Sequence, residues 1–264
     1  MDLLYCDESN LQSREGDFLL YGGILVPGDK AGSLSKKIDE IRRTAGMPPA
    51  AKLKFNPVPD GMSHEQFRDL KQQIIQAAID HDCKLLTYLV LHDLTKDPDE
   101  SRRFGINTVC YHYHCALTHK NDIGIVLIDR FNDEGNKIDG HLKDKMSVGV
   151  QLSYKDDPTR LSHIVGFHYA AIGQSNFTSL IDILIGSFRF SINAHCRGEE
   201  KLQKAARDIL DLMKPLFYSR YDNSICDMGI HFSPMKVKVA RYRDQYVSLQ
   251  AFLKDSGVNS GQRL

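Results

Sequence analysis

The alternation of apolar runs and helix-like segments along the chain constrains its fold more than any other sequence feature. Apolar runs at residues 1–8 and 18–26 flank a polar, glycine-containing segment at 11–17, and this pattern predicts a β-hairpin. Later apolar runs alternate with helical spacings, as in chains that build a sheet covered by helices. We therefore predict an α/β fold with a mixed sheet flanked by helices. The other strands are expected at 52–55, 84–91, 123–128, 161–169 and 236–242.

Start and stop signals place the helices. Ser63 and Gln66 have the spacing of a capping box, and Asp97 before Pro98 is typical of a helix start. Gly46, which two prolines follow shortly afterwards, ends the first helical segment. The predicted helices are 34–45, 63–77, 98–120, 179–194 and 199–217, with one more behind a polar loop inside 131–152.

Length and composition favour one domain over residues 1–264. Hydrophobic residues make up 42% of the chain and charged residues 26%, which excludes wholesale disorder. The longest apolar stretch, Phe18–Pro27, is about half of the roughly 20 residues that span a membrane. No basic segment precedes the first apolar run, so the chain does not begin like a secretory signal peptide. We therefore expect a cytoplasmic protein with no membrane partner.

The charge balance excludes one class of function. The 34 basic and 34 acidic residues cancel to a formal charge of zero, whereas proteins that bind nucleic acid through their overall charge are basic. A nucleic-acid partner therefore has to be argued from a local site. The six cysteines form no CxxC pair and lie mostly in apolar surroundings, so we expect buried, reduced thiols. Their positions are 6, 83, 110, 115, 196 and 226.

Three aspartates stand in positions that favour a metal site. Asp7 ends the first strand, Asp129 ends the apolar run at 123–128, and Asp182 interrupts an aliphatic helical run. Burying an aspartate is costly unless it is paired, protonated or metal-bound. Carboxylates at neighbouring strand ends, with one more from a facing helix, can converge on Mg²⁺ or Mn²⁺, which prefer oxygen ligands.

Each aspartate also has an ordinary structural explanation. Asp7 could cap backbone amides in a turn, Asp129 could pair with Arg130, and Asp182 could face solvent from a surface helix. Taken singly, these explanations are favoured. Taken together, in this order of elements, the three residues indicate a metal site.

Several sequence motifs resemble the DUF3800 family of predicted ribonuclease H-like proteins. The matching motifs are Tyr5-Cys6-Asp7-Glu8-Ser9, Tyr21-Gly22-Gly23-Ile24-Leu25-Val26-Pro27, Ile128-Asp129-Arg130 and the Ser179–Gly186 segment with Asp182. They lie within residues 1–190 and leave the last 70 or so residues uncovered. The resemblance implies a ribonuclease H-like sheet with helical additions and a divalent-metal phosphodiesterase site. It also implies that Asp7, Asp129 and Asp182 are the metal ligands.

The sequence departs from the family pattern at several positions. Asn10 follows the Asp-Glu-Ser triplet where the family often has glycine. The Glu-x-Lys motif of the family's third strand corresponds to Lys52-Leu53-Lys54, so one acidic residue is missing. In the helix motif, Ser179 replaces a glutamine and Ile181 replaces an alanine. Glu8 is a candidate fourth metal ligand, although strand alternation points it away from Asp7 unless the strand has already ended.

Basic residues offer candidate phosphate contacts. Lys54 is one candidate, and the segment at 236–243 supplies Lys236, Lys238, Arg241 and Arg243. On a strand, Lys236 and Lys238 would share one face. That pattern shields an edge strand from aggregation, and it also offers a cationic stripe to nucleic-acid phosphates.

Together these features predict metal-dependent hydrolysis of phosphodiester bonds in nucleic acid, with Asp7, Asp129 and Asp182 as catalytic metal ligands. The alternative is a catalytically degenerate interaction module with a protein partner in a defence or mobile-element system. The missing acidic residue at 52 favours the alternative, and the three retained aspartates favour the enzyme.

Overall fold

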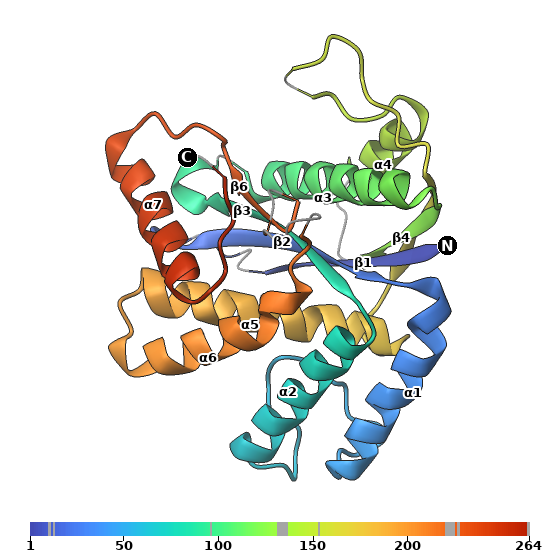
Figure 1. Ribbon diagram of the computed structural model, residues 1–264, viewed down its shortest axis with the longest axis vertical. Coiled ribbons are helices and arrows are strands. Elements are labelled where there is room, and N and C mark those ends of the chain that lie inside the picture. Colours follow the sequence, from blue (N-terminus) through green and yellow to red (C-terminus); the bar gives the residue numbers. More distant parts are fainter. Residues whose placement is uncertain are drawn as a thin grey trace.

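The structure, a computed structural model, is built around a mixed sheet with the strand order β5-β4-β1-β2-β3-β6 (Figure 1). It describes residues 1–9, 12, 14–95, 97–130, 137–152, 154–219, 225 and 228–262. The strands are β1 (Asp2–Ser9), β2 (Phe18–Val26), β3 (Lys84–Leu91), β4 (Gly124–Asp129), β5 (Ile164–Ala170) and β6 (Ile230–Ser233). The α/β prediction with a mixed sheet is confirmed.

Helices cover both faces of this sheet (Figure 1). The α-helices are α1 (Gly28–Thr44), α2 (His64–Asp80), α3 (Pro98–Lys120), α4 (Lys137–Ser147), α5 (Asn176–Cys196), α6 (Gln203–Met213) and α7 (Ala240–Asp255). Short 3-10 helices lie at His92–Leu94, Glu200–Leu202 and Lys214–Leu216. Helices α3 and α4 lie on one face, while α5 lies on the other and carries α1, α2 and α6 outside it. No helix in these described segments is long and apolar enough to cross a bilayer.

Strand β1 is the central element of the topology. It pairs antiparallel with β2, as the hairpin prediction requires, and parallel with β4 on its other side. Strand β3 pairs antiparallel with β2, and β5 pairs parallel with β4. The carboxyl ends of β1, β4 and β5 therefore lie at one edge of the sheet.

Two adjacent glycines let helices approach both faces of β2. A Cβ atom on Gly22 would lie 2.1 Å from Ile185 Cδ1 of α5, and one on Gly23 would lie 3.0 Å from Val109 Cγ1 of α3. Neighbouring residues of a strand point to opposite faces, so each glycine opens one face. The rest of β2 is fully buried between the two helical layers.

The starts of two helices agree with their sequence signals. Ser63 and Gln66 form a reciprocal capping box at α2, and Asp97 accepts a hydrogen bond from the Asp99 amide before Pro98 begins α3. The strand predicted at 84–91 is confirmed with its bounds. Cys6, Cys83 and Cys110 are buried free thiols. Asn10, the loop at 131–136 and Cys226 lie outside the described residues.

Three predictions of regular structure were wrong. Residues 52–55 form no strand, and the helix expected at 199–217 is α6 with a 3-10 turn at each end. Residues 236–239 are irregular and α7 begins at Ala240, so the late strand is absent. The short alternation at 236–240 is overridden by the helical spacing of Tyr246, Leu249 and Leu253, which are buried on one face of α7.

Candidate active site

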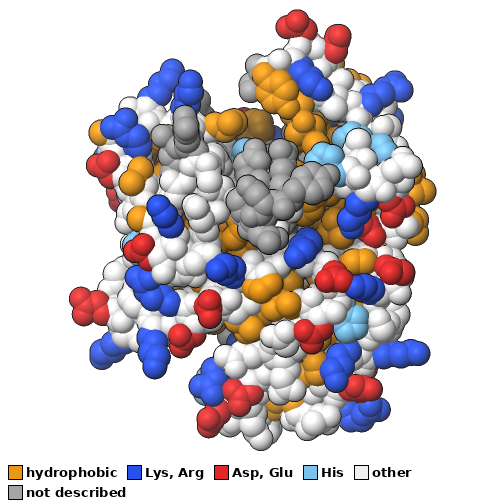
Figure 2. Space-filling view, viewed as in Figure 1, with side chains coloured by type: hydrophobic (Ala, Val, Ile, Leu, Met, Phe, Trp, Pro, Cys, Tyr) orange, Lys and Arg blue, Asp and Glu red, His pale blue; other side chains and the backbone are white. Residues whose placement is uncertain are grey.

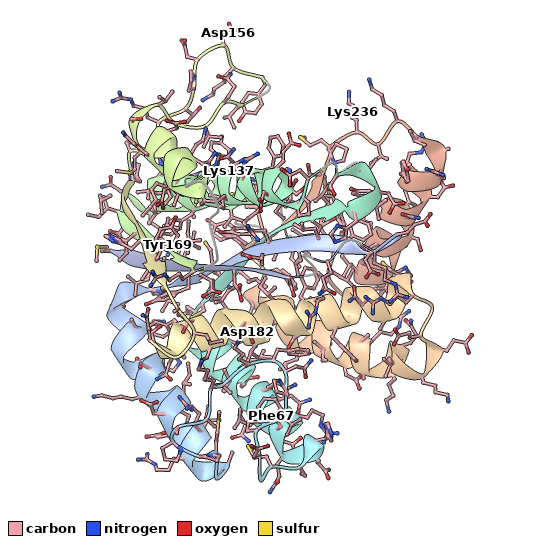
Figure 3. All side chains as sticks on the ribbon, turned by 180° about the vertical axis from the view of Figure 1, so that it is seen from behind. Phe67, Lys137, Asp156, Tyr169, Asp182 and Lys236 are labelled. Atoms are coloured by element: carbon pink, nitrogen blue, oxygen red, sulfur yellow. The ribbon has the colours of Figure 1, made fainter. Side chains whose placement is uncertain are left out.

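The candidate active site lies at the carboxyl ends of β1 and β4, on the face covered by α5. Cys6 is registered with Ile128 in the parallel pair, and Asp7 and Asp129 follow directly in their strands. Asp7 is opposite Gly22 in the antiparallel pair, so both residues face α5. Asp182 belongs to α5 and lies below the sheet in Figure 3. The three aspartates thus come from three segments of the sequence to one edge and one face of the sheet.

The charges of these carboxylates act on one another. Burial raises the pKa of Asp7 well above its usual range, and the charges of Glu8, Asp129 and Asp182 raise it further. Burial, reinforced by the charge of Asp182, also raises the pKa of Asp129. Burial likewise raises the pKa of Asp182. Partly buried carboxylates that repel one another are stabilised when one of them is protonated or when a cation binds between them.

Backbone amides hold two of the carboxylates. The Glu8 amide donates to Asp7 Oδ1 at 2.8 Å, and the Phe55 amide donates to Asp182 Oδ2 at 2.5 Å. The second bond joins α5 to the segment at 49–55, which connects α1 with α2. The strand expected at 52–55 within this segment does not form, and the chain reaches the site without regular structure.

Close packing fixes the 49–55 segment on α5. A Cβ atom on Gly186 would lie 2.3 Å from Phe55 Cγ, so the absence of a side chain there admits the Phe55 ring. Lys54 precedes Phe55, and its charge lowers the pKa of both Asp129 and Asp182 against the effect of burial. Lys54 therefore supplies positive charge to the carboxylates. Sequence reasoning found Lys54 but missed Gly186, whose signal was a lone glycine inside an aliphatic helix.

The donor set fits a divalent cation. Carboxylate oxygens are the ligands that Mg²⁺ and Mn²⁺ prefer, and the surplus negative charge would be relieved by such an ion. Among the residues described, however, no group of three His, Cys, Asp or Glu side chains already has the spacing of a metal site. To bind one ion, the side chains of Asp7, Asp129 and Asp182 would have to move closer together.

Glu8 points away from the other three carboxylates. The strand continues to Ser9, so alternation directs Glu8 to the face of α3, where it forms an ion pair with Arg102 at 3.2 Å. Arg102 also contacts Asp99 at 2.8 Å. Glu8 is thus not brought together with Asp7 and Asp182 on the α5 face.

The basic residues at 236–243 do not form the predicted cationic strand face. Lys236 and Lys238 lie in the irregular chain before α7, and Arg241 and Arg243 lie in its first turn. Figure 3 labels Lys236 and Asp182 on opposite sides of the sheet. The prediction of a strand stripe is wrong because its strand is absent. Figure 2 shows Lys and Arg side chains intermixed with Asp and Glu over the visible face, in keeping with the zero formal charge.

Comparison of the chain with protein-family models, with curated proteins and with solved structures finds no match. The site is therefore interpreted from its own geometry and charge.

We predict that Gly186→Ala destabilises the protein although alanine is the better helix former. The substitution gains about 1 kcal/mol of helix propensity, but overpacking against Phe55 costs about 1–3 kcal/mol. Urea unfolding should show a net loss of stability. The matched control is Gly32→Ala in α1, where an added Cβ meets nothing within 4 Å and stability should rise. Equal stabilisation by both substitutions would show that Phe55 does not pack closely on α5.

We also predict that Asp7→Asn stabilises the metal-free protein at neutral pH. Because the pKa of Asp7 is raised on folding, the native state holds its proton to higher pH than the unfolded chain does. The wild type therefore loses stability as pH rises above about 4, the ordinary range of an aspartate. The variant should lose less over the same range, because only Asp129 and Asp182 keep raised pKa values in it. Urea unfolding near pH 4 and near pH 7 measures the difference.

The control for this experiment is Asp244→Asn, which removes an exposed carboxylate from α7. It should leave the pH dependence of the unfolding free energy unchanged. A stability difference between wild type and Asp7→Asn that is the same at both pH values would contradict the charge argument.

Proposed function

We propose that the chain is a ribonuclease H-like nuclease that hydrolyses phosphodiester bonds of nucleic acid with Mg²⁺ or Mn²⁺. The observation that carries this proposal is the arrangement of Asp7, Asp129 and Asp182 at the ends of two neighbouring parallel strands and on the helix that faces them. The charges of Asp129 and Asp182, which raise the pKa of Asp7, support the proposal.

The strand order supports the ribonuclease H-like assignment. An antiparallel β1-β2-β3 unit is continued on the other side of β1 by β4 and β5, both parallel to β1. The sequence motifs that resemble the DUF3800 family include all three aspartates. In this assignment β6 and α7 are additions at the far edge of the sheet and beside α5.

Each residue of the site has a proposed role. Asp7, Asp129 and Asp182 would be the metal ligands, and the Phe55 amide would hold the Asp182 carboxylate in a fixed orientation. A bound divalent ion would supply a more acidic water and offset the charge of the phosphate. Lys54, which already acts on Asp129 and Asp182, would contact a phosphate oxygen.

Two observations favour a second candidate function, a catalytically degenerate interaction module. Lys52 replaces an acidic residue of the family motif. No ready-made ligand spacing occurs among the described His, Cys, Asp and Glu residues. Such a module would keep the fold and use the site, or a surface near it, to contact nucleic acid or a protein partner.

Metal-dependent cleavage tests the proposal. Labelled single-stranded RNA, single-stranded DNA and an RNA–DNA hybrid are incubated with the protein in Mg²⁺, Mn²⁺ or EDTA. We expect cleavage of at least one substrate with metal and none in EDTA. Asp7→Asn and Asp129→Asn should each lower the rate by about 100-fold or more, as loss of a metal ligand should cost at least as much as loss of its supporting contacts.

The control variant Asp244→Asn, purified in parallel, should cleave as the wild type does. Cleavage that is unchanged in Asp7→Asn and Asp129→Asn would contradict the proposed site. Binding of substrate with no cleavage under any metal condition would favour the interaction module.

A further inference from the structure

A cavity of about 710 Å³ lies beside the candidate active site, between the last turns of α1, the 49–55 segment and the start of α5. Residues of α1 and residues 49–53 line one side of it, and residues 172–179, far away in the sequence, line the other. The polar residues that line it are Ser35, Arg42, Lys52, Gln174, Ser175, Asn176 and Ser179.

The chemistry of the lining suits an anion. Among the described residues of the lining, two side chains are cationic, Arg42 and Lys52, and none carries a carboxylate. Arg42 Nη2 donates to the Ala51 carbonyl oxygen at 3.0 Å, which ties the 49–55 segment to α1. A guanidinium has five N–H donors, so this bond leaves donors for a ligand. Lys52 is exposed and is the second cationic residue of the lining.

Asp39, an acidic residue beside this cavity, is already engaged. Asp39 of α1 accepts a hydrogen bond from Asn176 Nδ2 at 3.0 Å. The same amide group donates to the Ser35 carbonyl and hydroxyl oxygens at 3.1 and 3.0 Å. These bonds join α1 to the start of α5 and hold the two walls of the cavity together.

The cavity and the aspartates share two structural elements. Ser179 lines the cavity and Asp182 is three residues further along α5, a rise of about 4.5 Å. Leu53 lines the cavity, and Phe55, two residues later, donates its amide to Asp182.

The sheet edge is shared as well. Asp129 is registered with Ala170 at the end of β5, and the residues that follow β5, from Ile172 to Asn176, form one wall of the cavity. The aspartates and the cavity are therefore neighbours on the same elements, so one bound strand could contact both.

We propose that this cavity is a subsite for a non-scissile backbone phosphate of the nucleic-acid strand bound at the candidate active site, with Arg42 and Lys52 as its cationic ligands. The inference rests on the proposed function, because it assigns the substrate's backbone a second contact point. Phosphate is bound by guanidinium and ammonium groups through charge-assisted hydrogen bonds.

Salt-dependent binding tests the subsite without cleavage. Binding of a fluorescent single-stranded oligonucleotide is measured by anisotropy in Ca²⁺ between about 50 and 200 mM salt for wild type, Lys52→Gln and Lys36→Gln. Lys36 is an exposed lysine of α1 that does not line the cavity, so both variants lose one positive charge.

We expect Lys52→Gln to flatten the slope of log affinity against log salt by roughly 0.7, the value for one lost contact to a single strand. The Lys36→Gln slope should equal that of the wild type. Equal slopes for the two variants would overturn the subsite, even if the protein cleaves nucleic acid with Mn²⁺. No binding by the wild type at low salt would overturn it too.

Two further results separate the subsite from the proposed function and from a free anion. A flattened slope in Lys52→Gln without metal-dependent cleavage supports the subsite and contradicts the nuclease. A Lys52→Gln variant that binds inorganic phosphate more weakly, but keeps the wild-type oligonucleotide slope, would show that the cavity takes a free anion, and the inference would be wrong.

Discussion

The packing of α5 on β2 is the contact on which the candidate site depends. Ile185 reaches the strand backbone at Gly22, and Asp7 is the residue opposite Gly22 on β1. Asp182 precedes Ile185 by one turn and is therefore held over the same part of the sheet. Each fully buried leucine or isoleucine stabilises the fold by about 1.5–3 kcal/mol, and α5 buries several on this face. This burial offsets the cost of keeping carboxylates partly out of water.

The electrostatics of the site follow from this packing. Three carboxylates with raised pKa values lie at one sheet edge, and the positive charge that acts on two of them comes from Lys54. Lys54 and the Phe55 amide compensate the charge only in part, since burial remains the largest influence on each aspartate. A surplus of this kind destabilises the metal-free fold and would be relieved by a bound cation.

Sequence patterns predicted the regular part of the molecule because its local signals agree with the tertiary structure. The hairpin, the strand at 84–91, and the helix that begins at Pro98 all have strong local signals, and the strand ends located Asp7 and Asp129. Asp7 and Asp129 come together because β1 and β4 are parallel neighbours that end at the same edge of the sheet. Asp182 joins them because α5 covers that face.

The parts that sequence patterns did not predict depend on contacts between distant segments. The 49–55 segment has no regular structure, and its course is set by Gly186, more than a hundred residues later. The expected strand at 236–242 failed because burial of Tyr246 and Leu249 favours a helix there. The cavity near Asp182 combines Arg42 and Lys52 with the start of α5, a combination that no local pattern contains.

The proposed function depends most on Asp7, Asp129 and Asp182 forming one site for a divalent metal ion. A crystal structure of the protein soaked in Mn²⁺, with the ion located by its anomalous scattering, tests this most directly. The account predicts an anomalous peak between the three carboxylates, with oxygen ligands at the distances typical of Mn²⁺. A peak only elsewhere, or three carboxylates that stay apart in the presence of the ion, would contradict it.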